Sequence, residues 1–185
     1  MAGKRKNADK SVYGAAPGAQ AAQSHTLSIL VDNEPGVLAR VIGLFSGRGY
    51  NIESLTVAET DEARNLSRIT IVSSGTMLVI EQIKHQLERL VPVHRVTDLT
   101  VLGPHVEREL ALIKVTGTGD KRIEALRAAD IFRAKVVDST LESFVFEVTG
   151  TAEKINAFVD LMRPLGLTDI SRTGAAAISR GKEAI

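Results

Sequence analysis

Apolar and polar residues alternate over residues 27–31, a pattern that predicts a half-buried β-strand. A polar break follows over residues 32–36. Apolar side chains then recur at helical spacing over residues 37–45, which predicts an amphipathic helix. Gly47 and Gly49 follow, and glycine commonly ends a helix because it tolerates the left-handed conformation. This part of the chain therefore predicts a strand, a loop and a helix in succession.

The same two periodicities continue along the first half of the chain. They predict strands at residues 52–58 and 66–73, a helix at 78–90 and a strand at 93–101. A polar turn over residues 60–65 separates the first two of these strands. The first half therefore has the order βαββαβ.

The second half repeats this order with little residue identity to the first, so the repeat is structural. Its predicted strands are residues 110–116, 132–138, 143–148 and 167–173, and its predicted helices begin at Asp120 and at Thr151. Pro164 is expected to end the second helix, because proline disrupts helical hydrogen bonding.

Two units of this kind indicate an α+β protein with two ferredoxin-like βαββαβ sandwiches in tandem. Each unit is expected to have one antiparallel sheet with two helices on one face. The predicted domains are residues 25–102 and 105–181, joined near Gly103 and Pro104. Residues 1–24 are rich in Ala and Gly and poor in large apolar side chains, so we expect a disordered tail there.

Charge and composition exclude several classes of protein. The net charge of the chain is +1. Residues 1–24 have a net charge of +3, so the predicted domains have a net charge of −2 and offer little attraction for nucleic acid or anionic lipid. We expect no membrane association, since the longest apolar runs fall short of the roughly 18 residues that a spanning helix needs. The chain has no cysteine, which excludes disulfides and thiolate metal sites and fits the reducing cytoplasm.

RNA-recognition domains share the βαββαβ order, so RNA binding is an alternative. Those domains stack bases on aromatic residues of their central strands. The third predicted strand has no aromatic residue between positions 68 and 72, and the whole chain has five Phe and two Tyr. These positions argue against an RNA-binding surface.

Catalytic motifs are also missing from the sequence. The four histidines form no HExxH pair and suit surface or half-buried structural positions, and no Walker A loop or GxSxG elbow is present. Residues 117–119 (Gly-Thr-Gly) suit a tight turn between strand and helix better than a dinucleotide loop. Carboxylates scattered over the turns still leave an acid–base pair formed in space as an open alternative.

One segment has chemistry suited to an amino-acid ligand. Residues 32–38 (DNEPGVL) join the first strand to the first helix, and a helix N-terminus favours a carboxylate. The Asn33 side chain can donate and accept hydrogen bonds, Gly36 lets a ligand approach the backbone, and Val37 and Leu38 are apolar. An Asx turn that caps the helix and binds no ligand explains the same residues.

The stretch from Asp32 to Asp61 resembles the ACT domain of the small subunit of acetohydroxyacid synthase, also called acetolactate synthase. The run RGYNIESL at residues 48–55 is the most specific part. Further matches are HVEREL at residues 105–110, DIFR at 130–133 and ISRG at 178–181. The resemblance covers residues 25–181 in order, and it makes the first unit an ACT domain.

This resemblance implies a non-catalytic regulatory subunit in branched-chain amino acid biosynthesis. It implies binding to a catalytic subunit that holds thiamine diphosphate, Mg²⁺ and FAD, activation of that subunit, and feedback inhibition by valine. No cofactor is expected on this chain. The implied valine-binding residues are Asn33, Gly36 and Asn51, with Val37, Leu38 and Ile52 as neighbours. A stand-alone ACT sensor of another enzyme, or a small enzyme on a ferredoxin-like scaffold, are the alternatives.

The spacing of the implied ligand residues predicts a homodimer. Asn33 precedes the first helix, and Asn51 follows it, so they lie at opposite ends of a helix about 18 Å long. One valine molecule cannot span that length. If both residues bind valine, a two-fold pairing of ACT domains must supply one residue from each chain.

Overall fold

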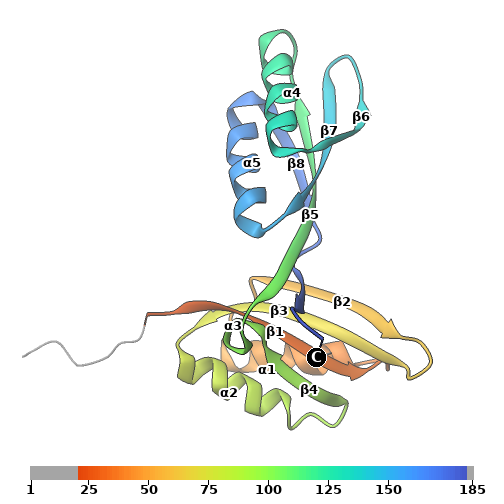
Figure 1. The fold of residues 1–185 in the computed structure, drawn as a ribbon, viewed down its shortest axis with the longest axis vertical. Helices are drawn as coiled ribbons and strands as arrows, with labels where there is room; N and C mark the ends of the chain where they lie inside the picture. The colour runs from red at the N-terminus through yellow and green to blue at the C-terminus, as the bar shows by residue number, and fades with distance from the viewer. Residues whose placement is uncertain (1–20, 183–185) are drawn as a thin grey trace, which may run out of the picture.

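The computed structural model describes residues 21–182 and has two α+β domains placed end to end (Figure 1). The N-terminal domain consists of β1 (Gln23–Asp32), α1 (Val37–Arg48), β2 (Ser54–Asp61), β3 (Leu66–Gly75), α2 (Met77–Leu87), β4 (Val93–Asp98) and α3 (Leu99–Leu102). The C-terminal domain consists of β5 (His105–Thr116), α4 (Asp120–Phe132), β6 (Lys135–Ser139), β7 (Ser143–Gly150), α5 (Ala152–Gly166), β8 (Leu167–Arg172) and β9 (Ala176–Ser179). The predicted tandem of ferredoxin-like units is confirmed.

The N-terminal domain has the antiparallel strand order β2-β3-β1-β4, with α1 and α2 on one face of the sheet. Apolar residues of β1, among them Leu27 and Ile29, are fully buried against Val41 and Phe45 of α1. On the opposite face the buried residues carry hydroxyl side chains. One of them is Thr26, which is 5% exposed. The alternation in the sequence therefore marks which side of the sheet the helices cover.

The C-terminal domain repeats this arrangement with the order β6-β7-β5-β8 and with α4 and α5 on one face. Its core contains Phe146 and Phe158, both fully buried, with ring centroids 6.1 Å apart. The two cores are separate clusters of buried residues. Each domain thus has a hydrophobic core of its own.

Two elements were not predicted, and both lie where the domains meet. α3 replaces the end of the predicted strand at residues 93–101, because the Asp98 carboxylate accepts hydrogen bonds from the backbone N–H groups of Thr100 and Val101. β9 follows the predicted last strand and pairs with the first residues of β5, His105 to Arg108. In Figure 1 the strands β5 and β9 form the connection between the domains.

Several other boundaries differ from prediction; β5, for example, begins at His105 and not at residue 110, and β6 begins at Lys135 because Phe132 belongs to α4. β1 begins at Gln23, inside the predicted tail, and residues 1–20 lie outside the described residues. β2 begins at Ser54 and not at residue 52. Pro164 does not end α5, which continues to Gly166.

A buried hydrogen-bonded pair ties the first strand to the end of the N-terminal domain. His25 Nδ1 lies 2.7 Å from Asp98 Oδ2, and both side chains are 2% exposed. The expectation of surface or half-buried histidines is therefore wrong for His25. The pair fixes the start of β1 against the residue that caps α3.

Gly166 is expected to be indispensable for folding of the C-terminal domain. Its φ is +108°, and a Cβ there would lie 2.0 Å from the carbonyl oxygen of Thr116. We expect Gly166→Ala to lower the free energy of unfolding by about 3 kcal/mol or more. Gly47→Ala in α1 is the control, because a Cβ at Gly47 meets nothing within 4 Å. Urea unfolding should leave that control stable, and equal stability of both variants would contradict the prediction.

Candidate ligand site at the ends of helix α1

The loop before α1 is held in place by its backbone. Asp32 N–H donates to the carbonyl of Pro92 at 2.9 Å, and Asn33 N–H donates to the carbonyl of Asn65 at 2.8 Å. The Asp32 carboxylate also lies 2.6 Å from His94 Nε2. These contacts fix the backbone at Asp32 and Asn33, and the Asn33 side chain remains exposed.

The N-terminus of α1 is open. Gly36 is the N-cap residue with φ +87°, and a Cβ there would meet nothing within 4 Å. No side chain caps the helix. The alternative of an Asx turn that caps α1 is therefore wrong. First-turn N–H groups beside an uncovered glycine suit an anionic group such as a carboxylate.

The two apolar neighbours of Gly36 have different environments. Val37 is 4% exposed and belongs to the core, so its side chain faces the sheet. Leu38 is 37% exposed and remains available on the surface. Only Leu38 can offer an apolar side chain to a ligand in this conformation, while Val37 can contribute its backbone.

The other predicted site residues lie beyond the C-terminus of α1. Gly49, with φ +71°, ends the helix, and Tyr50 N–H donates to the Phe45 carbonyl at 3.0 Å. Asn51 has an exposed side chain, and its carbonyl accepts a 2.7 Å hydrogen bond from Ser73 Oγ. Ile52 is half-buried and packs against the N-terminal core. The Asn51 amide is therefore displayed from a fixed backbone.

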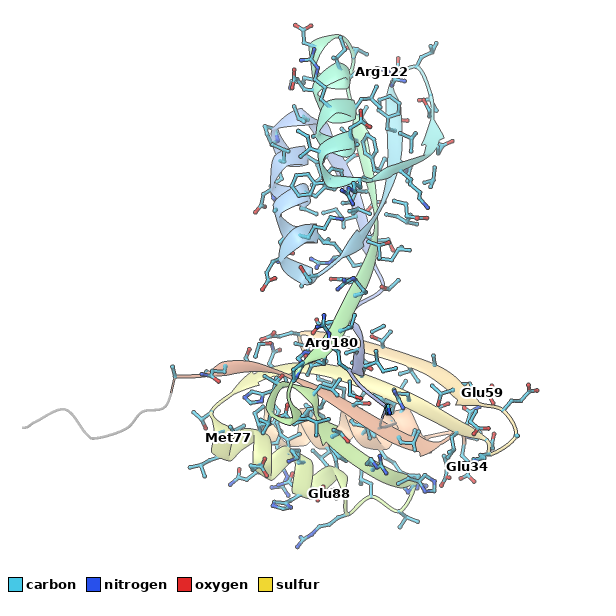
Figure 2. The ribbon with its side chains drawn as sticks, viewed as in Figure 1. Glu34, Glu59, Met77, Glu88, Arg122 and Arg180 are labelled. Atoms are coloured by element: carbon cyan, nitrogen blue, oxygen red, sulfur yellow. The ribbon has the colours of Figure 1, made fainter. Side chains whose placement is uncertain are left out.

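One chain does not bring the two sets of residues together. α1 has 12 residues, so Asn33 and Asn51 are separated by a helix of about 18 Å. Figure 2 shows Glu34, next to Asn33, at one end of the N-terminal domain. Met77 lies at the other end, four residues after Ser73, which is hydrogen-bonded to Asn51. The amide groups could meet around one small ligand only if a second chain supplied one of them.

α1 and β2 lie along the same side of the N-terminal domain. β2 is an edge strand that pairs with β3. α2 contacts β4 at the opposite edge, and α1 lies beside α2. The edge formed by α1 and β2 carries exposed apolar side chains, including Leu38 and Val57, which is 42% exposed.

Other chemistry in the described residues is sparse. Residues 21–182 contain no group of three or more His, Asp or Glu side chains placed to hold a metal ion. No helix in this part of the chain is long and apolar enough to cross a membrane. A cavity of about 400 Å³ lies between the domains and is lined by residues of both.

Comparisons with known proteins match both domains to one family. Residues 27–95 match the family model described as "AHAS small subunit-like ACT domain", and residues 108–181 match "Small subunit of acetolactate synthase". A probable acetolactate synthase small subunit of Archaeoglobus fulgidus is 49% identical over 86% of this chain and 98% of its own length. The chain belongs to the acetolactate synthase small-subunit family.

Relatives from other organisms support the same assignment. The acetolactate synthase isozyme 3 small subunit of Escherichia coli is 47% identical over 84% of this chain and 94% of its own length. The crystal structure of the acetolactate synthase small subunit from Thermotoga maritima superposes with a TM-score of 0.78 at 41% identity, covering 87% of this chain and 99% of that one. The resemblance stated from the sequence is confirmed.

As a member of this family, the chain is a non-catalytic subunit. The thiamine diphosphate, Mg²⁺ and FAD implied by the resemblance belong to the catalytic subunit. The residues that the resemblance implies for a ligand are the exposed amides at the two ends of α1.

Sequence reasoning missed an ion pair of the C-terminal domain that lies beside the interdomain cavity. Glu109, 7% exposed, accepts two hydrogen bonds from Arg172, to Oε1 at 2.7 Å and to Oε2 at 2.6 Å. The hydrogen bonds that Arg172 donates to Glu109 raise the pKa of Arg172 above its usual value, so this guanidinium stays charged. No periodic pattern marks such a pair, because its members are 63 residues apart.

Proposed function

We propose that this chain activates the catalytic subunit of acetolactate synthase and makes it sensitive to feedback inhibition by valine. Membership of the family supports the partner, and the uncapped N-terminus of α1 supports an amino-acid ligand. The observation that carries the valine proposal is the open Gly36 backbone beside the exposed amide of Asn33. The absence of cysteine fits a cytoplasmic location for the complex.

Valine offers one carboxylate, one ammonium group and a branched apolar side chain, and the proposed site has a partner for each. The carboxylate would accept hydrogen bonds from the first-turn N–H groups of α1. The amides of Asn33 and Asn51 can donate to the carboxylate and accept from the ammonium group. Leu38 and Ile52 would contact the side chain, with Val37 supporting Leu38 from the core.

The dimer that completes this site would form along α1 and β2. β2 presents an edge that no other described strand covers, and an uncovered edge can pair with a second copy of itself. A two-fold axis at that edge would set the α1 helices antiparallel and bring Asn33 of each protomer to Asn51 of its partner. Such an interface is self-complementary and gives two equivalent sites.

Reconstitution tests the proposed function. We expect the purified chain alone to form no acetolactate from pyruvate, and to raise the rate of acetolactate formation when added to the catalytic subunit. Valine should then lower the rate of the complex, and it should do less to the catalytic subunit alone. Pyruvate turnover by the pure chain would support a small enzyme instead. Valine binding without any effect on the catalytic subunit would support a stand-alone sensor.

A further inference from the structure

The chain crosses from the C-terminal domain back to the N-terminal domain at Gly174 and Ala175. The Ala175 N–H donates to Ser54 Oγ at 2.8 Å. The Ala175 carbonyl accepts a hydrogen bond from Thr56 Oγ1. Both backbone polar groups of one residue are thus bound by side chains of β2 in the other domain.

The fit at this crossing is tight. Gly174 has φ +82°, and a Cβ there would lie 2.7 Å from Ser54 Oγ and 3.3 Å from the Leu55 carbonyl oxygen. Ala175 is 4% exposed. The four residues Ser54, Thr56, Gly174 and Ala175 are called the junction clamp below. Because Gly174 and Ala175 lie directly against β2, this segment cannot move along β2 without breaking the two hydrogen bonds of Ala175.

On its other side the clamp is fixed to the C-terminal domain. Arg172, two residues before Gly174, pairs with Glu109 of β5 through two hydrogen bonds. The same guanidinium donates to Asn156 Oδ1 of α5 at 2.7 Å. The end of β8, the strand β5 and the helix α5 are therefore connected at one point, and a displacement of Ala175 acts on the whole C-terminal domain.

The N-terminal side of the clamp is continuous with the proposed valine site. Ser54 lies three residues after Asn51, and the backbone of the segment between them is hydrogen-bonded to β3 at Asn51 and at Glu53. Ser73 Oγ donates to the Asn51 carbonyl at 2.7 Å, and Glu53 N–H donates to the Val72 carbonyl at 2.9 Å. A change at Asn51 therefore reaches Ser54 through a segment that has little freedom to absorb it.

The clamp lies beside a cavity between the domains and outside both hydrophobic cores. The interdomain cavity of about 400 Å³ is lined by Glu53 and Ser54 from the N-terminal domain and by Asn156 and Arg172 from the C-terminal domain. Elements that meet at a few hydrogen bonds beside an unfilled cavity can tilt more easily than elements that share a packed core.

We propose that the junction clamp transmits valine binding from the ACT domain to the C-terminal domain by setting the position of the C-terminal domain. The inference rests on the proposed valine function and assigns Ser54, Thr56 and Gly174 as positioning residues. Valine can inhibit only if it favours one arrangement of the complex over another, and the clamp is a contact through which that preference passes. Another contact between the domains is the 3.2 Å hydrogen bond from Thr26 Oγ1 to Glu107 Oε2, which does not involve β2.

The test combines Ser54→Ala with Thr56→Val, which removes both side-chain partners of Ala175. The matched control is Thr168→Ala, which removes an exposed hydroxyl that donates to the Lys114 carbonyl at 3.2 Å within the C-terminal domain. Calorimetry on the isolated chain should give a valine affinity within about twofold of wild type for both variants. In the reconstituted complex, the concentration of valine for half inhibition should rise about fivefold or more in the clamp variant only.

A second measurement reports the position of the domains without valine. The chain has no cysteine, so Glu62→Cys and Leu141→Cys provide a unique pair of spin-label positions on exposed turns of the two domains. Labelled chain diluted with unlabelled chain should give one narrow distance, and the clamp variant should give a broad distribution. An unchanged distribution, or unchanged valine inhibition in the clamp variant, would overturn the proposal. A wild-type chain that binds no valine would refute the proposed function instead, while the distances would still decide whether the clamp positions the domain.

Discussion

Replacement of Asn33 or Asn51 by alanine is expected to remove valine feedback while the complex keeps its activity without valine. Each side chain is exposed and makes no contact that the fold depends on, so the variants should fold normally. Loss of one hydrogen bond to a charged ligand group costs about 1.5–3 kcal/mol, which corresponds to a valine affinity about 10- to 150-fold weaker. Calorimetry on the isolated chain would measure this affinity.

Asn156→Ala is the matched control, since that amide bonds to Arg172 in the C-terminal domain and lies outside the proposed site. Its valine affinity should stay within about twofold of wild type, far from the change expected at a ligand contact. Full valine affinity in both Asn33→Ala and Asn51→Ala would contradict the proposed site, whatever the dimer looks like.

A heterodimer of the two variants separates a shared site from two sites within single chains. If each site takes Asn33 from one protomer and Asn51 from its partner, the heterodimer has both substitutions in one site and an intact second site. About half of the wild-type valine-binding capacity should then return. A verified heterodimer with no recovered capacity would show that the site is not shared in this way.

The parts of the fold that were predictable are those that repeat a pattern. Leu27, Ile29 and Val31 alternate along β1, and Val37, Val41 and Phe45 recur along α1, because one face of each element is buried. The elements that were missed depend on particular contacts, one local and one long-range, that leave no periodic pattern. α3 exists because Asp98 caps it, and β9 exists because the chain returns to residues 105–108 of β5.

Pro164 shows how a local rule can be overridden. A proline was expected to end the helix, yet α5 extends to Gly166. Proline removes one backbone donor, which a helix tolerates near its end when the following residues are held elsewhere. Here Gly166 turns directly into β8, where its close approach to the Thr116 carbonyl fixes the last turn.

The candidate site was only partly predictable. The sequence shows which residue types are present, but the burial of each side chain depends on the whole fold. The open backbone of Gly36 and the exposed amides of Asn33 and Asn51 follow from their places before and after α1. The burial of Val37 could not be separated from the exposure of Leu38 by residue type alone, since both are apolar. The junction clamp had no signal in the sequence at all, because its hydrogen bonds join residues about 120 positions apart, Ser54 and Ala175.

A fragment that ends at residue 102 is expected to bind valine but to lose the coupling of bound valine to the catalytic subunit. The buried apolar core of the N-terminal domain lies between residues 27 and 96, so the cut removes none of it. The His25–Asp98 pair and α3 also remain. The sheet face that the cut uncovers carries hydroxyl side chains, among them Thr26 and Thr70, which water can solvate at little cost.

Because both ends of α1 and the edge of β2 are intact in residues 21–102, the fragment should dimerise and bind valine within about threefold of the full-length affinity, a change below one hydrogen bond. It lacks β5, β9 and Ala175, so bound valine has no contact through which to act on a C-terminal domain. Circular dichroism would confirm that the fragment is folded, and calorimetry and the acetolactate assay would then be run on the same preparation. A folded fragment that gives no valine heat would place part of the valine site in the C-terminal domain, and a fragment that still activates the catalytic subunit would place the activating surface on the ACT domain.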